Sequence, residues 1–242
     1  MMPRVGTPWR VDLLCPMSAL RGQYVSRFVV LDASPAHSGR LSGVHELELL
    51  DWKRRVFALY ADVRSAGDPE SAWRAWRDGR DTLFRGHPES PLSPDGRERF
   101  RGLRYFGYDP AFRVLGTLAQ GDDEMRDVTA SGGETVRFRR FGAVRFELAG
   151  EQRELSLYWL EGYGGGVFLP FADATGGLET YGGGRYLLDT VKGADLGEAD
   201  GRLVLDFNFA YNPSCAYDPR WVCPLTPPEN RLDSAVRAGE QH

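Results

Sequence analysis

The stretch Glu134–Trp159, ETVRFRRFGAVRFELAGEQRELSLYW, decides the fold class. Apolar residues such as Val136 and Phe138 alternate with polar ones along most of it. A period of two is typical of a strand that turns one face toward a core. Glycine-containing breaks at 141–142 and 149–151 divide the pattern. We therefore predict an antiparallel meander of three strands, at 134–140, 144–148 and 155–159.

Further strands are predicted on both sides of this stretch, at 112–118, 167–171, 185–188 and 202–209. The segments between them are short or rich in glycine, as is usual in antiparallel sheets. The acidic residues 192–200 are expected to form an exposed loop. Residues 210–232 contain so many X-Pro steps that no regular element is expected there.

The pattern changes to a helical one upstream of the strands. Leu47, Leu50 and Phe57 fall at near-helical spacing, which predicts a helix over 44–64. Further apolar residues widen this face of the helix: Trp52, Val56, Leu59 and Val63. Asp68-Pro69 is typical of an N-cap followed by proline in the first helical turn. It predicts a second helix over 69–84.

Residues 1–42 differ from the rest, because four prolines interrupt short apolar fragments that keep no period. Two interpretations are open: a disordered extension from an upstream-extended translation start, with the true start near Val44, or an ordered arm that docks on the domain. For residues 43–242 we predict one α+β domain, mainly antiparallel β. Its sheet would be curved or partly closed into a barrel, with the two helices packed outside.

Composition excludes some classes of function. The formal net charge of -4 argues against nucleic-acid binding, which needs a basic surplus. No apolar run approaches the length that crosses a bilayer, and no signal-peptide core is evident, so we expect a cytoplasmic protein without membrane contact. Of the 30 Lys and Arg residues, only Lys53 and Lys192 are lysines. We attribute this bias to GC-rich coding.

No metal site and no cofactor are predicted. Cys215 and Cys223 lack the Cys-x-x-Cys or histidine partners that zinc prefers. Two half-buried thiols beside prolines are the simpler interpretation, and a disulfide is disfavoured in a cytoplasmic protein. His87 has no neighbour that suggests a catalytic triad, and we expect it to pack against the second helix.

The segment 203–210 carries the main candidates for chemistry. A period of two places Asp206 and Asn208 on one face of the predicted strand. That face is either a wet surface or the wall of a cleft, where a carboxylate needs a partner. Glu229, which follows two prolines, could complete a carboxylate pair with Asp206 for general acid–base catalysis. Alternatively, Glu229 hydrogen-bonds loop backbone.

Several uncommon strings in the C-terminal third carry a resemblance. They are FADATGG at 171–177, LDFNFAYNPSCAY at 205–217 and CPLTPPENRL at 223–232. Together they resemble the bacterial and archaeal proteins grouped as domain of unknown function 1684, over about residues 165–240. The resemblance implies no assigned activity.

Three hypotheses on function follow. The first is binding of a small polar or anionic molecule in a pocket of the C-terminal half, and its candidate residues are Asp173, Arg185, Asn208, Tyr211 and Asn212. The second is a hydrolase-type enzyme that uses Asp206 and Glu229 as acid and base. In the third, these strings only lock the C-terminal segment over the sheet. Whether the protein is an enzyme stays open.

Overall fold

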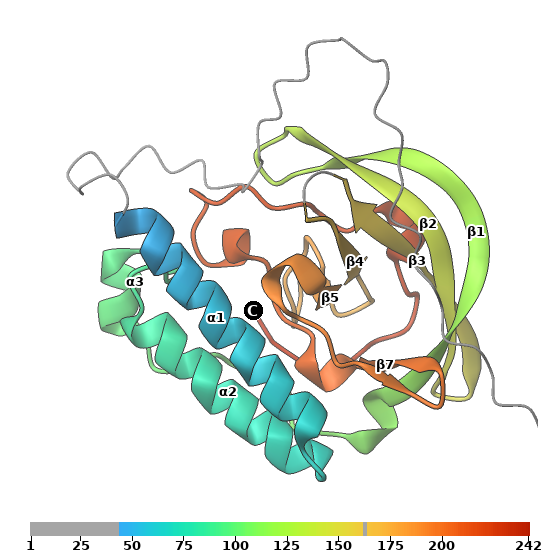
Figure 1. Ribbon diagram of the computed structural model, residues 1–242, viewed down its shortest axis with the longest axis horizontal. Helices are drawn as coiled ribbons and strands as arrows, with labels where there is room; N and C mark the ends of the chain where they lie inside the picture. The colour runs from blue at the N-terminus through green and yellow to red at the C-terminus, as the bar shows by residue number, and fades with distance from the viewer. Residues whose placement is uncertain (1–43, 162–163) are drawn as a thin grey trace, which may run out of the picture.

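The structure, a computed structural model, describes residues 44–161 and 164–242 (Figure 1). The predictions for residues 1–42 therefore lie outside the described residues. The helices are α1 (Val44–Ser65), α2 (Pro69–Gly86) and the short α3 (Pro94–Arg99), so the bounds predicted for the first two are right to within two residues. No described helix is both long enough and apolar enough to cross a membrane.

The sheet has seven antiparallel strands in the order β5-β4-β3-β2-β1-β7-β6. Their bounds are Arg113–Thr129 (β1), Thr135–Leu148 (β2), Glu151–Leu160 (β3), Gly166–Phe171 (β4), Arg185–Asp189 (β5), Glu198–Ala199 (β6) and Arg202–Asp206 (β7). Because β5 and β6 remain edges, the sheet is not closed into a barrel. Figure 1 shows β1 and β2 curving around the C-terminal segment, with α1 and α2 on the open side. The predicted α+β class with a curved sheet and outer helices is confirmed.

β2 continues without interruption through residues 141–142, where the sequence predicts a turn. Its register with β3 shifts between Arg140 and Gly142, so Phe141 is an extra residue in β2. A bulge of this kind bends a strand and increases its twist, which lets β2 follow the curve of the sheet. The turn predicted at 149–151 does join β2 to β3, and Ala149 and Gly150 both have positive φ there.

α2 begins where the sequence predicts it. The Asp68 carboxylate accepts a hydrogen bond from the Ser71 amide at 2.9 Å, and Pro69 occupies a position whose amide needs no partner. The large side chains that α2 buries are Trp73, Trp76, Leu83 and Phe84.

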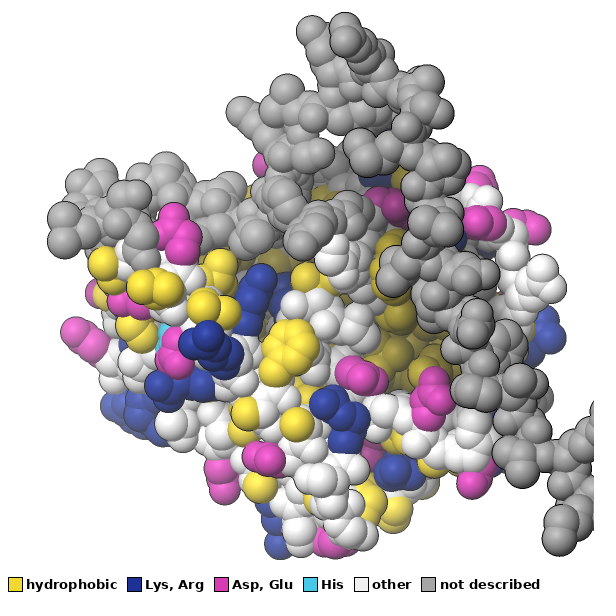
Figure 2. All heavy atoms as spheres, in the orientation of Figure 1, with side chains coloured by type: hydrophobic (Ala, Val, Ile, Leu, Met, Phe, Trp, Pro, Cys, Tyr) yellow, Lys and Arg dark blue, Asp and Glu magenta, His cyan; other side chains and the backbone are white. Residues whose placement is uncertain are grey.

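Only part of the predicted apolar face of α1 faces the core, and the residues that do so are Val56, Leu59 and Val63. Leu47 and Phe57 are 67% and 45% exposed, whereas Tyr60 is buried against Trp76, with 5.9 Å between the ring centroids. Figure 2 shows hydrophobic side chains on the outer surface near the start of α1. This helix carries apolar residues on two sides, so spacing alone does not choose between them, and contact with α2 does.

Alternate strand residues enter two hydrophobic clusters on opposite faces of the sheet. Leu157 belongs to the first cluster, while Tyr158 belongs to the second, which α1 and α2 cover. β7 ends at Asp206, so the strand predicted to reach residue 209 is wrong beyond that point. The turn Phe207–Phe209 sends its first ring into the first cluster and its last into the second.

The predicted exposed loop at 192–200 is also wrong in part. Ala194 and Leu196 are buried, and 198–199 form the edge strand β6. Residues 210–232 carry only short 3-10 turns, as their prolines predict.

Candidate functional site

Arg185 and Asp173, two predicted ligand-binding residues, form a buried ion pair that holds the C-terminal segment. The guanidinium is 1% exposed and lies 3.2 Å from the Asp173 carboxylate. It also donates to the carbonyl oxygens of Val236 and Ala238, the first at 2.9 Å. Asp173 in turn accepts from the Val236 amide at 2.7 Å. Burial lowers the pKa of Arg185, and the negative charge of Asp173 partly offsets this shift.

Asn208 and Asp206 hold the end of β7 against the residues before β1. The Asp206 carboxylate accepts from the backbone and side-chain amides of Asn208, at 3.0 and 2.8 Å. The Asn208 side chain also bonds both backbone groups of Asp109, and the backbone carbonyl of Asn208 accepts from the Trp73 indole at 2.8 Å. Burial raises the pKa of Asp206 to about 6, although these bonds and the charge of Arg113, 3.8 Å away, lower it.

Asp206 should make the protein less stable as pH rises from about 4 to about 6. Its folded-state pKa lies above the ordinary value of 3.8, so the folded state binds the proton more tightly than the unfolded state. Stability is therefore greatest below that window, and ionisation costs about 3 kcal/mol across it. Urea unfolding at a series of pH values should show this fall in the parent and a flatter profile in Asp206→Asn. Parallel profiles would contradict the assignment.

Asn212 belongs to a buried polar cluster around Glu240. The Glu240 carboxylate accepts from the Asn212 amide at 3.2 Å, from the Arg80 guanidinium at 2.9 Å and from the Tyr217 hydroxyl. Burial raises the pKa of Glu240, and the charge of Arg80 opposes this shift. Tyr211, the neighbouring candidate, donates to the carboxylate of Asp189 at 3.4 Å.

The proposed carboxylates Asp206 and Glu229 lie beside opposite ends of β1. Asp206 pairs with Arg113 in the sheet register, whereas Glu229 lines a shallow hollow with residues 126–129. Glu229 is exposed and accepts from the Tyr158 hydroxyl at 2.8 Å. The next residue, Asn230, is fully buried and bonds backbone groups of β3 and β4. The structure does not bring the two carboxylates together.

An aromatic cavity lies beside α1, on the face of the sheet that carries the second cluster. Its volume is about 220 Å³, and its walls come from α1, the loop after α2, strands β2 to β5 and residues 214–224. The aromatic residues that line it are Trp52, Phe138, Phe168, Tyr186 and Trp221. None of the seven site residues predicted from the sequence lines this cavity.

Both lysines of the chain, Lys53 and Lys192, line this cavity. Lys192 pairs with Asp189 at 3.3 Å. Desolvation lowers the pKa of Lys192, but the Asp189 carboxylate raises it, and the net shift is upward. The described residues give Lys53 no ion pair. Glu89 is a second carboxylate in the wall, and it bonds the imidazole of His45 at 3.0 Å.

Local backbone geometry positions Lys192. It ends the 3-10 turn Thr190–Lys192, and Gly193 follows with a φ of 85°. A side chain on Gly193 would be strained there, and its Cβ would lie 2.8 Å from the Phe57 ring. The glycine thus allows the turn to approach α1, so the two lysines reach the same cavity from different elements.

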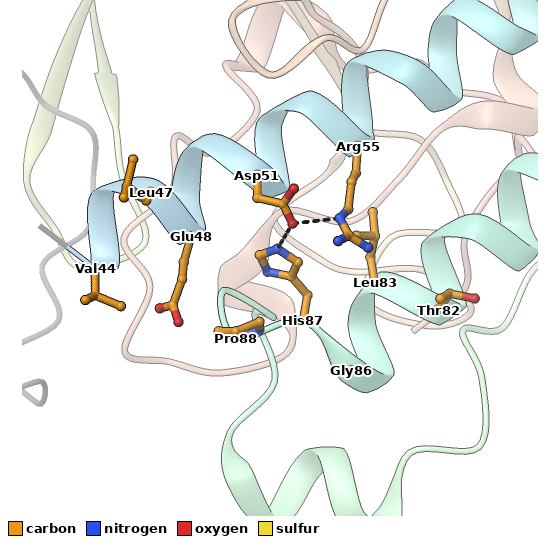
Figure 3. A pocket seen from close by; sticks show the side chains of 10 residues that line it. All are labelled: Val44, Leu47, Glu48, Asp51, Arg55, Thr82, Leu83, Gly86, His87 and Pro88. Carbon is orange, nitrogen blue, oxygen red and sulfur yellow. Dashed lines mark hydrogen bonds and ion pairs between the residues drawn. The ribbon is translucent and has the colours of Figure 1, made fainter. Parts of the chain in front are cut away.

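A second, more open groove runs between α1 and the end of α2 (Figure 3). The Asp51 carboxylate bridges His87 and Arg55, at 3.2 and 2.7 Å. His87 accepts at Nδ1 from the Glu89 amide, so Nε2 carries the proton that it donates to Asp51. These contacts tie α1 to the residues after α2, consistent with the packing role expected for His87.

Sequence reasoning missed the cavity, because its walls come from seven separate segments that no motif connects. One signal was present: the scarcity of lysine, which composition alone does not distinguish from coding bias. In the described part of the chain, no three His, Cys, Asp or Glu side chains gather as a metal site requires.

Comparisons with known proteins agree with the resemblance in the C-terminal third. A model of the family described as "Protein of unknown function (DUF1684)" matches residues 98–241. A solution NMR structure of an uncharacterized protein from Haloarcula marismortui is 37% identical with a TM-score of 0.51, and the match covers 72% of this chain and 94% of that chain. No curated protein matches. Because the family match spans more than half of its residues, this chain belongs to the family of proteins of unknown function DUF1684.

Proposed function

We propose that this protein binds a small anion with an apolar, ring-sized body in the aromatic cavity beside α1. One observation carries the proposal. Nearly all basic residues of this chain are arginines, and both of its lysines lie in the wall of one cavity. The expectation of a small anionic ligand is kept, but the residues assigned to it are different ones.

The chemistry of lysine supports an anion as the recognised group. An ammonium is a compact point charge on a flexible stem, so it can pair with a carboxylate or phosphate without the fixed bidentate geometry of a guanidinium. Lys192 shares its charge with Asp189, and Glu89 bonds His45. Lys53 is therefore the cation that we assign to the anionic group, with Lys192 as a weaker second contact.

The size and lining of the cavity support a small, partly apolar ligand. Pockets for drug-sized ligands occupy about 300–1,000 Å³, and an apolar cavity of about 150 Å³ holds one benzene. A cavity of about 220 Å³ lies between these limits and suits one ring with a short charged substituent. Aryl or short-chain carboxylates are the corresponding class.

Phenylacetate and the uncharged benzyl alcohol make a matched pair of probes for this proposal. Calorimetric titration of the full chain should show saturable binding of phenylacetate and weaker binding of benzyl alcohol. Lys53→Met should weaken phenylacetate binding about fivefold, the value of about 1 kcal/mol for a partly exposed charge contact, and Lys192→Met should weaken it less.

Arg54→Met is the control, because this exposed residue follows Lys53 on the same helix and does not line the cavity. It should leave both affinities unchanged. Equal affinities for the two probes, or the same loss in Arg54→Met as in Lys53→Met, would remove the anion from the proposal. Absence of saturable binding by either probe would remove the cavity.

For the residues that the sequence singled out, we propose the structural role. The bonds of Asp173 and Arg185 to residues 236–240, and that of Asn212 to Glu240, support a function in holding the C-terminal segment.

A further inference from the structure

Cys215 and Cys223 face each other across a tight reversal of the chain. Cys215 lies in the 3-10 turn Ser214–Ala216, and a further turn, closed by a bond from the Trp221 amide to the Asp218 carbonyl at 3.2 Å, brings the chain back. The backbone amide of Cys215 then donates to Cys223 Sγ at 3.4 Å. The Cys215 side chain branches from the carbon bonded to that amide nitrogen, and the two thiols are close enough to share a side-chain hydrogen bond, so the pair is placed for disulfide formation.

The two thiols differ in exposure and in their remaining partners. Cys215 is half-buried, with the Tyr181 hydroxyl 3.5 Å from its sulfur, whereas Cys223 is 5% exposed and walls the aromatic cavity. The Cys223 backbone amide is fixed by a bond to the Ser131 hydroxyl at 3.1 Å. One thiol is therefore accessible to a solute, and the other is held behind it.

Hydrogen bonding between the two thiols shifts their pKa values in opposite directions, and the more accessible thiol has the lower pKa. The bond from the Cys223 thiol, with the smaller effect of Tyr181, lowers the pKa of Cys215 to about 6, although burial opposes this. The same bond and burial raise the pKa of Cys223. At neutral pH the accessible sulfur is thus mainly a thiolate, the form that reacts with oxidants, while the buried one keeps its proton.

We propose that Cys215 and Cys223 form a redox-active dithiol that peroxides oxidise to a disulfide, with Cys215 as the attacked thiol and Cys223 as the resolving one. This proposal does not rest on ligand binding in the cavity, although Cys223 is part of the cavity wall. The chemistry needs one hydroperoxide as the oxidant and no group beyond the two side chains.

The reaction balances in two steps. The Cys215 sulfur attacks the terminal peroxide oxygen, the O–O bond breaks, and the leaving alkoxide or hydroxide takes a proton, which leaves a sulfenic acid on Cys215. Cys223 Sγ then attacks Cys215 Sγ, the S–O bond breaks and water leaves with the Cys223 proton. Two thiols and one peroxide give one disulfide, one alcohol or water, and one water. A dithiol reductant reverses the oxidation.

Intact-mass and peptide-mass measurements on the reduced full chain test this proposal. All variants carry Cys15→Ser, so that only the two thiols in question remain. One equivalent of hydrogen peroxide should remove two hydrogen atoms and join the peptides that contain Cys215 and Cys223, and dithiothreitol should restore the mass. The thiolate fraction of Cys215 at pH 7 should be about thirtyfold that of an unperturbed thiol, and the lower nucleophilicity of a low-pKa thiolate reduces the expected rate advantage to about two- to threefold.

Two variants assign the roles of the sulfurs. Cys223→Ser should accumulate a sulfenic acid on Cys215 that dimedone traps, because the resolving thiol is gone. In Cys215→Ser the remaining Cys223 thiol is buried and keeps its proton, so it should react with peroxide more slowly than Cys215 does in Cys223→Ser. Absence of the crosslinked peptide in the parent would overturn the proposal, and so would equal peroxide rates in the two variants.

Discussion

Replacing Arg185 with methionine should lower the free energy of unfolding by about 3–5 kcal/mol. The variant leaves the Asp173 carboxylate buried without its cation, and the carbonyls of Val236 and Ala238 lose their donor. An uncompensated buried charge costs far more than a lost surface pair. Urea unfolding followed by tryptophan fluorescence measures the change.

Two comparisons make this result specific. Arg202→Met removes a half-exposed surface arginine of β7 and should change stability by less than about 0.5 kcal/mol. Adding Asp173→Asn to Arg185→Met removes the stranded charge and should recover part of the loss. An Arg185→Met protein that keeps its stability but no longer binds phenylacetate would reverse the assignment, and would return Arg185 to a ligand pocket.

Trp76→Ala should cost about 3–5 kcal/mol of stability, the range for truncating a large buried aromatic residue. Trp76 is 1% exposed, and its ring lies 5.0 Å from Phe209 and 5.8 Å from Tyr105. The Arg80 guanidinium lies 5.0 Å from the same ring. The indole therefore joins α2 to the turn after β7, and its loss leaves a cavity between them. Thermal unfolding followed by calorimetry measures the effect.

Arg74→Ala on the same helix is the control for Trp76→Ala. Its side chain is 68% exposed and pairs only with the neighbouring Glu70, so its loss should cost less than about 1 kcal/mol. If both variants lowered the melting temperature by a similar amount, the helix propensity of α2 would contribute more to stability than the packing of Trp76 does. That result would contradict the proposed join.

The fold class could be predicted from the sequence because its main signals are local. Alternation in 134–159 marks the strands, and Asp68-Pro69 marks the start of α2. What failed depends on contacts between distant residues. Phe141 is a bulge because β2 has to bend with the sheet, and Leu47 is exposed because α2 packs against the other side of α1.

The candidate site was harder to predict for the same reason. Asp173, Arg185 and Asn212 are polar residues in, or next to, irregular segments of the chain. Such residues serve equally well for binding a ligand or for hydrogen-bonding buried backbone groups. Only their partners distinguish the two roles. Lys53 and Lys192 lie 139 positions apart, as their numbers show, and only the folded chain places them in one cavity.

The bond from Arg185 to Val236 spans 51 residues of chain, and this separation has a consequence during translation. At about 5–20 residues per second, a ribosome needs about 3–10 s between making the arginine and making its partner. Throughout that interval β5 has been made, but the carbonyls of Val236 and Ala238 that its first residue binds have not. The hydrogen bonding of this buried arginine is therefore among the last native contacts that can form on a growing chain.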